Sequence, residues 1–230
     1  MGTNVLPLKL GIVNSFLLTS GNTCPILVDT GNSGDHKKIV RGIEKAGYRP
    51  QDISLVVLTH GHMDHAGGVY EFSRISGAKV IVRKRDAPLV RGEKAPDFSP
   101  VGLKGKVFKS LIPVVERLTS ESKRKSENLE LEELDEEEIN LEGFGVDGRI
   151  LTTPGHTAGS LSVALRNGSV IVGDLVMGRF FSFGRASYPP FVSDMELLKR
   201  SIKKILDLDP DTIYASHGGP YTPDDLRKLV

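Results

Sequence analysis

The 230-residue sequence has no tryptophan and only one cysteine, Cys24. A single cysteine excludes an internal disulfide framework, which favours a reducing, cytoplasmic compartment. No apolar run is long enough to span a bilayer, and the N-terminus lacks the basic and apolar regions of a secretory signal peptide. We therefore expect no association with a membrane.

An excess of charge of either sign is also missing. Lysine and arginine total 30 and aspartate and glutamate total 29, so the formal net charge is +1. Without a strong positive field the chain has no electrostatic footprint for nucleic acid, and we expect no nucleic-acid partner. Hydrophobic residues make up 39% of the chain, which is ordinary for a soluble globular protein with a sizeable core.

The chain does contain a cluster of metal-binding residue types at residues 60–65, directly after an apolar run at residues 53–59 that predicts a buried strand. Alternate residues of an extended chain point the same way, so His60 and His62 can bind one ion. Asp64 and His65 follow after the turn and can face a second ion. Imidazole and carboxylate groups suit zinc, iron or manganese. An exposed polar loop is the alternative, but three histidines and an aspartate at this spacing argue against it.

Further polar residues also follow predicted strands. Asp29 ends an apolar run, and it either orients the metal loop through hydrogen bonds to its backbone or serves as a simple turn residue. Asp174 directly follows another run, where an unpaired carboxylate would be costly and a position shared by two cations would remove that cost. His156 and His217 lie at comparable strand ends. His36, in the first turn of a predicted helix, is interpreted as an exposed bystander.

Hydrophobic periodicity predicts the elements between these residues. Strands are expected at residues 5–10, 13–19, 24–31, 53–59, 77–82, 148–153, 161–165, 169–172 and 212–216. Helices are expected at residues 35–46, 68–75 and 194–206. Short apolar strands covered on both faces, with helices between some of them, indicate a layered α/β core.

Residues 59–65 resemble the His-x-His-x-Asp-His signature of the metallo-β-lactamase-fold hydrolases, and residues 153–160 are similar to the third-region motif of that family. The family's bridging aspartate and final histidine have counterparts in Asp174 and His217. The resemblance covers about residues 14–221 except 84–142, and the metal motifs look like those of glyoxalase II. It implies a single α/β domain over residues 1–230, a four-layer αββα sandwich with the metal site at one edge of the two sheets.

The resemblance also implies two ions and their ligands. One ion would be held by His60, His62 and His156, and the other by Asp64, His65 and His217, with Asp174 as the bridge. Asp64 and Asp174 would be the catalytic carboxylates. Thr157 and Ser160, close to His156, could fix the orientation of its imidazole through hydrogen bonds.

Such a site implies a hydrolase with a small-molecule substrate. A hydroxide bridging two divalent ions, zinc in the first place and Fe²⁺ or Mn²⁺ as alternatives, would attack an ester, thioester, lactone or phosphodiester bond. Asp64 would pass a proton to the leaving group. The alternative function is a persulfide dioxygenase on the same scaffold, an oxidoreductase with one non-haem iron held by two histidines and one aspartate. A non-catalytic protein is disfavoured because no ligand is missing.

The subfamily is left unassigned. Asp174 argues against the true β-lactamases of this fold, which usually lack a matching aspartate. Met177 stands where acyl-homoserine lactonases carry a tyrosine. The short segment after His217 argues against the glutathione-binding extension of glyoxalase II.

Two stretches have open interpretations. Residues 84–142 form an irregular insertion with several prolines, a short apolar patch at residues 107–112 and a charge run at residues 121–142. This insertion is either a solvated, mobile connection or a lid over the metal site. Aromatic and basic residues after Asp174 form either a substrate wall or core packing with solvated arginines, and these candidates are Arg179, Phe180, Phe181, Phe183, Arg185 and Tyr188.

Overall fold

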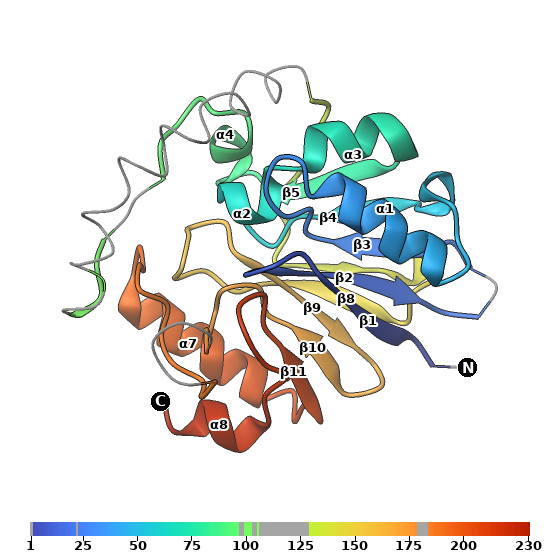
Figure 1. Cartoon of the computed structure of the whole chain (residues 1–230). Coiled ribbons are helices and arrows are strands. Elements are labelled where there is room, and N and C mark those ends of the chain that lie inside the picture. Colours follow the sequence, from blue (N-terminus) through green and yellow to red (C-terminus); the bar gives the residue numbers. More distant parts are fainter. Residues whose placement is uncertain (1, 22, 97–98, 103–104, 106–128, 179–183) are drawn as a thin grey trace.

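The computed structural model describes residues 2–21, 23–96, 99–102, 105, 129–178 and 184–230. Within these residues the chain forms two β-sheets packed face to face, with helices on both outer sides (Figure 1). The predicted four-layer αββα sandwich is therefore confirmed. None of the helices in the described ranges is long and apolar enough to cross a bilayer. Cys24 is an exposed free thiol, and the cytoplasmic compartment stays a prediction.

The first sheet holds six strands among the described residues, in the order in which they occur along the chain. They are β1 (Asn4–Lys9), β2 (Asn14–Thr19), β3 (Ile26–Val28), β4 (Leu55–Val57), β5 (Lys79–Arg83) and β6 (Glu132–Leu134). Strands β3, β4 and β5 run parallel, with Val28 opposite Val57 and Val57 opposite Ile81. Their carboxyl ends therefore meet at one edge of the sheet.

The second sheet has the strand order β11-β10-β9-β8-β7 within the described part of the chain. These strands are β7 (Glu138–Asn140), β8 (Gly148–Thr152), β9 (Leu161–Leu165), β10 (Ser169–Ile171) and β11 (Thr212–Tyr214). Strand β9 is antiparallel to both β8 and β10, and β11 is parallel to β10. Strands β8, β10 and β11 consequently end at the same edge, which brings the loops that follow them together.

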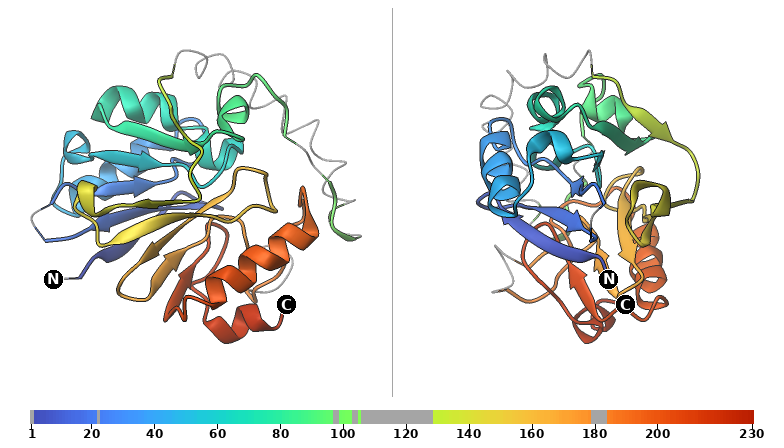
Figure 2. Two further views of the ribbon diagram at one scale, coloured as in Figure 1. Left: turned by 180° about the vertical axis from the view of Figure 1, so that it is seen from behind. Right: turned by 90° about the vertical axis from the view of Figure 1, so that its right-hand side faces the viewer.

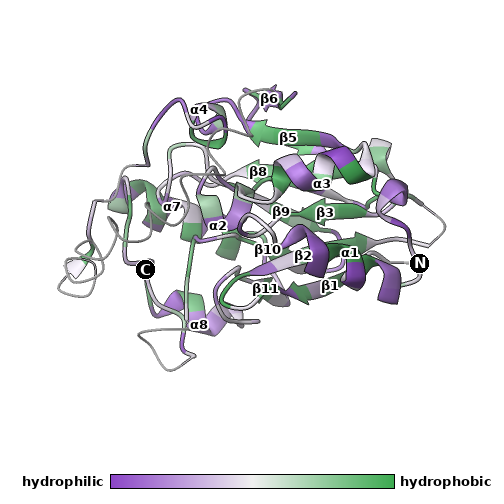
Figure 3. Ribbon diagram, turned by 45° about the horizontal axis from the view of Figure 1, so that its top comes forward, coloured by the Kyte–Doolittle hydropathy of each residue, from purple (hydrophilic) through white to green (hydrophobic). Residues whose placement is uncertain are grey.

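Three apolar layers hold the sandwich together. The middle layer lies between the sheets and includes Val57 and Ile171. One outer layer packs the first sheet against α1 (His36–Lys45) and α3 (Val69–Ser76). The other packs the second sheet against α7 (Met195–Leu206) and α8 (Pro223–Arg227). Figure 2 shows the helices on opposite sides of the two sheets, and Figure 3 shows hydrophobic residues along most strands.

The three longest helices among the described residues, α1, α3 and α7, form where the periodicity of the sequence predicts them. In α1, Ile39 and Ile43 are four residues apart and both fully buried, so one face of the helix packs on the sheet. The chain leaves α1 through Gly47, whose φ of +87° favours glycine. In α7 the side chain of Asp194 accepts a hydrogen bond from Leu197 N, which caps the helix start.

The insertion at residues 84–142 is partly regular. It contains the short helix α4 (Ala87–Val90) and the edge strands β6 and β7, with a 3₁₀ helix, η2 (Glu142–Phe144), at its end. A second 3₁₀ helix, η1 (Pro50–Asp52), precedes β4. The acidic strands escape prediction because each turns mainly one apolar residue inward, Leu134 in β6 and Ile139 in β7. Residues 106–128, with the apolar patch and the first part of the charge run, lie outside the described residues, so the lid stays a prediction.

Candidate metal centre

The loop that carries His60, His62, Asp64 and His65, which we call the metal loop, follows β4. His62 has an extended backbone, and the short helix α2 (Met63–Ala66) begins immediately after it, so Asp64 and His65 lie on a helical turn. Gly61 separates the first two histidines and packs tightly, because a Cβ there would lie 2.6 Å from Leu89 Cβ. Glycine at this position lets the loop pass close to α4.

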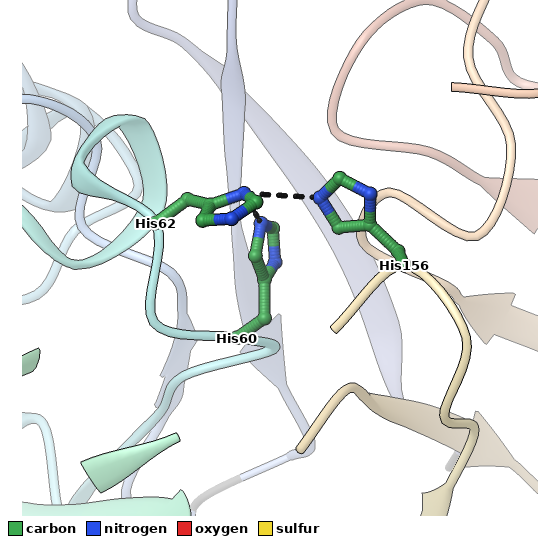
Figure 4. A group of neighbouring side chains, drawn as sticks. All are labelled: His60, His62 and His156. Atoms are coloured by element: carbon green, nitrogen blue, oxygen red, sulfur yellow. Dashed lines mark hydrogen bonds between the residues drawn. The ribbon is translucent and has the colours of Figure 1, made fainter. Parts of the chain in front are cut away.

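Three imidazoles converge at this edge of the sandwich (Figure 4). His60 Nε2 lies 3.1 Å from His62 Nδ1, and His156 Nε2 lies 3.0 Å from the same atom. We call His60, His62 and His156 the three-histidine group. Burial, followed by the neighbouring histidines, lowers the pKa of His60 well below its usual value, and burial together with His156 lowers that of His62 to about 3. Neutral rings keep a lone pair available for a metal ion.

Asp64, His65 and His217 form a second group, which we call the mixed group. Asp64 Oδ2 lies 3.1 Å from His217 Nε2 and 3.8 Å from His65 Nε2. Burial alone would raise the pKa of Asp64, but His65 and His217 outweigh it and hold that pKa well below the usual range. Burial alone would lower the pKa values of His65 and His217, but Asp174 and Asp64 raise both above the ordinary histidine value.

Asp174 lies between the two groups. Its Oδ2 is 3.6 Å from both His156 Nε2 and His217 Nε2, and its Oδ1 is 3.5 Å from His65 Nε2. Burial would raise the pKa of Asp174, but His217 and His65 outweigh burial and lower it to about 2. Among the described residues, Asp174 Oδ1 and His65 Nε2 are buried without a hydrogen-bond partner. Such atoms are costly to bury unless a ligand satisfies them, so the donors fit divalent metal ions.

Backbone and carboxylate oxygens accept hydrogen bonds from the Nδ1 atoms of three of these rings. His65 Nδ1 bonds to Asp29 Oδ2 at 2.8 Å, His156 Nδ1 to the Phe191 carbonyl at 2.9 Å, and His217 Nδ1 to the Ile12 carbonyl at 3.0 Å. In each case Nδ1 is occupied and Nε2 points to the centre. This arrangement fixes the tautomer and the direction of each ring before any ion binds.

Asp29 bonds to the metal loop as well as to the ring of His65. It is fully buried, its Oδ1 accepts the backbone N–H of Thr59 at 2.7 Å, and its Oδ2 accepts the Thr59 hydroxyl at 2.7 Å. Its φ of +61° lies in the left-handed region, which costs free energy for a residue other than glycine. The surrounding hydrogen bonds offset this strain. The same bonds therefore fix both the metal loop and the backbone of Asp29.

We expect Asp29→Asn to weaken the binding of one ion about tenfold without unfolding the protein. Asparagine tolerates the left-handed backbone, but its amide group would face the N–H of Thr59 or the ring of His65. Competition of wild type and variant with a coloured zinc chelator measures the change. Equal affinities would show that Asp29 does not orient His65.

Thr157 and Ser160 act on the loop rather than on the imidazole of His156. Ser160 Oγ accepts the backbone N–H of Thr157 at 3.0 Å, and Thr157 Oγ1 donates to Asp86 Oδ2 at 2.7 Å. We predicted that these hydroxyls orient the imidazole of His156. In the structure the Phe191 carbonyl accepts the hydrogen bond from His156 Nδ1 instead. The sequence does not reveal this carbonyl because a backbone acceptor carries no residue signature.

Asp86 is a further buried carboxylate at this site, and it was not predicted from the sequence. This carboxylate is 1% exposed and accepts hydrogen bonds from loops on both sides of the three-histidine group. It lies three residues after β5, and a polar residue just after a buried strand is the signal that identified Asp29 and Asp174. The same signal could have identified Asp86, but the residues around it were interpreted as the start of an irregular insertion.

The candidate substrate residues are only partly placed. Arg179, Phe180, Phe181 and Phe183 lie outside the described residues. Arg185 is exposed, whereas the Tyr188 ring packs against the core beside α7 and its hydroxyl donates to the Leu229 carbonyl. His36 lies at the start of α1, where it is half-buried rather than exposed as predicted, and it belongs to none of the donor groups found among the described residues.

In the metal-free protein the histidines of the two groups should make opposite contributions to the pH dependence of the free energy of unfolding. Burial is the first cause that lowers the pKa values of His60, His62 and His156 below the unfolded value of about 6.5, so acidification protonates the unfolded chain first and lowers the free energy of unfolding. The pKa values of His65 and His217 are raised, so their stabilisation is present below about pH 6.5 and is lost as pH rises through the folded pKa.

We therefore expect the melting temperature of the metal-free protein to be highest near about pH 6.5. Calorimetry with excess chelator between about pH 5 and about pH 9 tests this. A melting temperature that rises steadily across the whole range would contradict it.

Comparison with known proteins identifies relatives over nearly the whole chain. The model of the family described as "Metallo-beta-lactamase superfamily" matches residues 8–217. "Probable metallo-hydrolase MJ0888" of Methanocaldococcus jannaschii is 28% identical over 210 residues, with 89% of this chain and 87% of that protein covered. "Hydroxyacylglutathione hydrolase GloC" of Haemophilus influenzae is 24% identical over 227 residues, with 96% and 92% covered.

Solved structures share the architecture. The structure described as "TTHA1623 in a di-iron-bound form" has a TM-score of 0.68 to this chain at 24% identity, and covers 97% of this chain and 98% of its own. At this identity the likeness establishes the fold.

Proposed function

Because the chain belongs to the metallo-beta-lactamase superfamily, we propose that it is a hydrolase with a dinuclear metal centre. The three-histidine group would hold one ion and the mixed group the other. The observation that carries this proposal is the position of Asp174, whose two oxygens lie 3.5 to 3.6 Å from ring nitrogens of both groups. A carboxylate in this position would offset the repulsion between two cations.

Imidazole and carboxylate donors suit zinc first, with iron and manganese as alternatives. When bound, such ions supply a water molecule of lowered pKa as the nucleophile and an electrophile for a carbonyl or phosphoryl oxygen. Two carboxylates do not neutralise two divalent ions, so the centre keeps a positive charge. It therefore favours a small substrate that is anionic or that becomes anionic in the transition state.

Asp64 has the geometry for proton transfer. Its side chain is 33% exposed, against 2% for Asp174, so it lies on the side that a substrate can reach. The oxygen Oδ2 faces the rings of His65 and His217, which leaves Oδ1 for a proton. The neighbouring histidines hold its pKa low, so the carboxylate is ionised, and from this position it would relay a proton from the attacking water to the leaving group.

The bond that is cleaved is an ester, thioester, lactone or phosphodiester, and the thioester is the first to test. The relative named hydroxyacylglutathione hydrolase aligns over 92% of its length, and a hydroxyacyl group on the glutathione thiol is a thioester.

The same donor chemistry supports a second candidate function. His60, His65 and Asp174 also form a group of two histidines and one carboxylate, the donor set of non-haem iron oxygenases. One iron in this group would favour a persulfide dioxygenase.

Metal analysis followed by a substrate panel distinguishes the two candidates. The protein is purified without added metal, and its zinc, iron and manganese are measured per chain. We expect two ions per chain, with cleavage of at least one substrate among thioesters, lactones and phosphodiesters. One iron per chain, with oxygen consumption in the presence of a persulfide and no hydrolysis, would replace the hydrolase by the dioxygenase.

A further inference from the structure

A buried carboxylate outside both donor groups joins the loops that carry the three-histidine group. Asp86 Oδ2 accepts the backbone N–H of Gly61 at 2.9 Å and the hydroxyl of Thr157 at 2.7 Å. Asp86 Oδ1 accepts the backbone N–H of Gly159 at 2.9 Å. All three partners can donate a hydrogen bond, and the two oxygens of an ionised carboxylate accept all three.

The partners of Asp86 belong to both halves of the sandwich. Gly61 lies between His60 and His62, in the loop after β4 of the first sheet, whereas Thr157 follows His156 in the loop between β8 and β9 of the second sheet. Asp86 itself follows β5. It therefore bonds to the chain next to every member of the three-histidine group, and none of these three hydrogen bonds is to a ring.

The loops are pressed against this carboxylate. A Cβ on Gly159 would lie 2.4 Å from Asp86 Oδ1, and a Cβ on Gly61 would lie 2.9 Å from the Asp86 carbonyl oxygen. Such separations exclude a side chain at either position unless the loops move apart. The carboxylate and the two glycines thus fix how closely the two loops approach each other.

A different carboxylate serves the mixed group. Asp29 bonds to the ring of His65 and to Thr59, whereas Asp86 bonds to the two loops of the three-histidine group. We propose that Asp86 is a positioning residue that sets the spacing of the three-histidine group and thereby the metal affinity of that group, with little effect on the mixed group. The inference rests on the proposed function only in taking these groups as metal sites.

Replacement of Asp86 by asparagine separates charge from shape. Asparagine has one oxygen, so either Gly61 N–H or Gly159 N–H would face an amide NH₂ group and one loop would shift. Removal of groups that orient metal ligands typically costs about 10- to 100-fold in metal affinity. We expect Asp86→Asn to lower the zinc affinity of the three-histidine group within this range.

Two backgrounds isolate the two groups. His217→Ala disables the mixed group, and His62→Ala disables the three-histidine group. Zinc affinity is measured by chelator competition with and without Asp86→Asn in each background. We expect a loss of at least about tenfold in the His217→Ala background and a change below about threefold in the His62→Ala background. In the first background, one equivalent of Co²⁺ should also show a weaker visible absorption band with Asp86→Asn, because fewer of the three rings reach the ion.

Asp35→Asn is the matched control. Asp35 is also a buried carboxylate, but within the described part of the chain its side chain bonds to Asn32 and Lys38 and to no proposed metal ligand, so its variant should leave zinc affinity unchanged in both backgrounds. If Asp86→Asn does not fold, Thr157→Val removes one of the three hydrogen bonds and should weaken zinc binding about three- to tenfold in the His217→Ala background alone.

Equal losses of zinc affinity in the two backgrounds, or no loss in the His217→Ala background, would overturn the inference. The outcome is independent of the count of ions in wild type. A wild-type protein with one ion would end the dinuclear proposal, while the His217→Ala background would still decide the role of Asp86. A three-histidine group that binds no zinc in that background would overturn both.

Discussion

Asp174→Ala is expected to lower the occupancy of at least one of the two ions and to reduce hydrolysis by at least about a hundredfold. Asp174 is the one carboxylate that faces both donor groups among the described residues. Its loss leaves two cations close together without the shared negative charge that offsets their repulsion. Metal content and initial rate on the best substrate measure the effect.

Two further variants test whether charge or shape matters. Asp174→Asn should be nearly as harmful as Asp174→Ala, because the amide keeps the shape of the carboxylate and loses its charge. Asp29→Asn should be milder, since Asp29 acts through His65 and the Thr59 backbone. If Asp174→Ala keeps two ions and most of its activity, Asp174 does not bridge and a single-ion centre becomes the better description.

Complete removal of metal should reduce hydrolysis by at least about a thousandfold. Bulk water has a pKa of about 15.7, whereas water on a catalytic zinc ion has a pKa of about 7, so without metal the concentration of nucleophile near neutral pH falls steeply. The protein is dialysed against a strong chelator, its residual metal is quantified, and its rate is compared with that of the untreated protein.

Re-addition of metal supplies the control. Zinc should restore the rate in proportion to occupancy, and parallel samples with iron and manganese identify which ion supports the reaction. Activity that persists when less than about a tenth of the sites hold metal would contradict a metal-dependent reaction.

The proposed metal ligands could be predicted because each follows a strand whose apolar pattern is strong. His60 and Asp174 come directly after such runs, and the parallel strand ends bring them to one edge. The spacing within residues 60–65 also carries its own signal, since alternation and a following turn separate the two pairs of donors. The position of each strand in its sheet was not needed for this inference.

The supporting contacts were harder to predict because they join distant parts of the chain. Asp86 bonds to Gly61, 25 residues away, and to Thr157, 71 residues away. His156 is oriented by the Phe191 carbonyl, which lies 35 residues further along. No local pattern links these partners, and a carbonyl is present at every position, so only the folded chain shows which one is used.

The two sheets supply separate shares of one centre. The loop after β4 carries four of the proposed ligands, and the loops after β8, β10 and β11 carry the other three. Beside these loops the sheets are also joined by hydrogen bonds, such as Leu161 N to the Thr59 carbonyl at 2.7 Å and Thr157 Oγ1 to Asp86 Oδ2 at 2.7 Å. A bound ion would therefore cross-link the two halves of the chain, and at a free concentration a thousand times its dissociation constant it would stabilise the fold by about 4.1 kcal/mol. Under metal starvation the chain would unfold more often and be exposed to proteases. Metal supply would therefore govern the lifetime of each protein molecule as well as its catalytic rate.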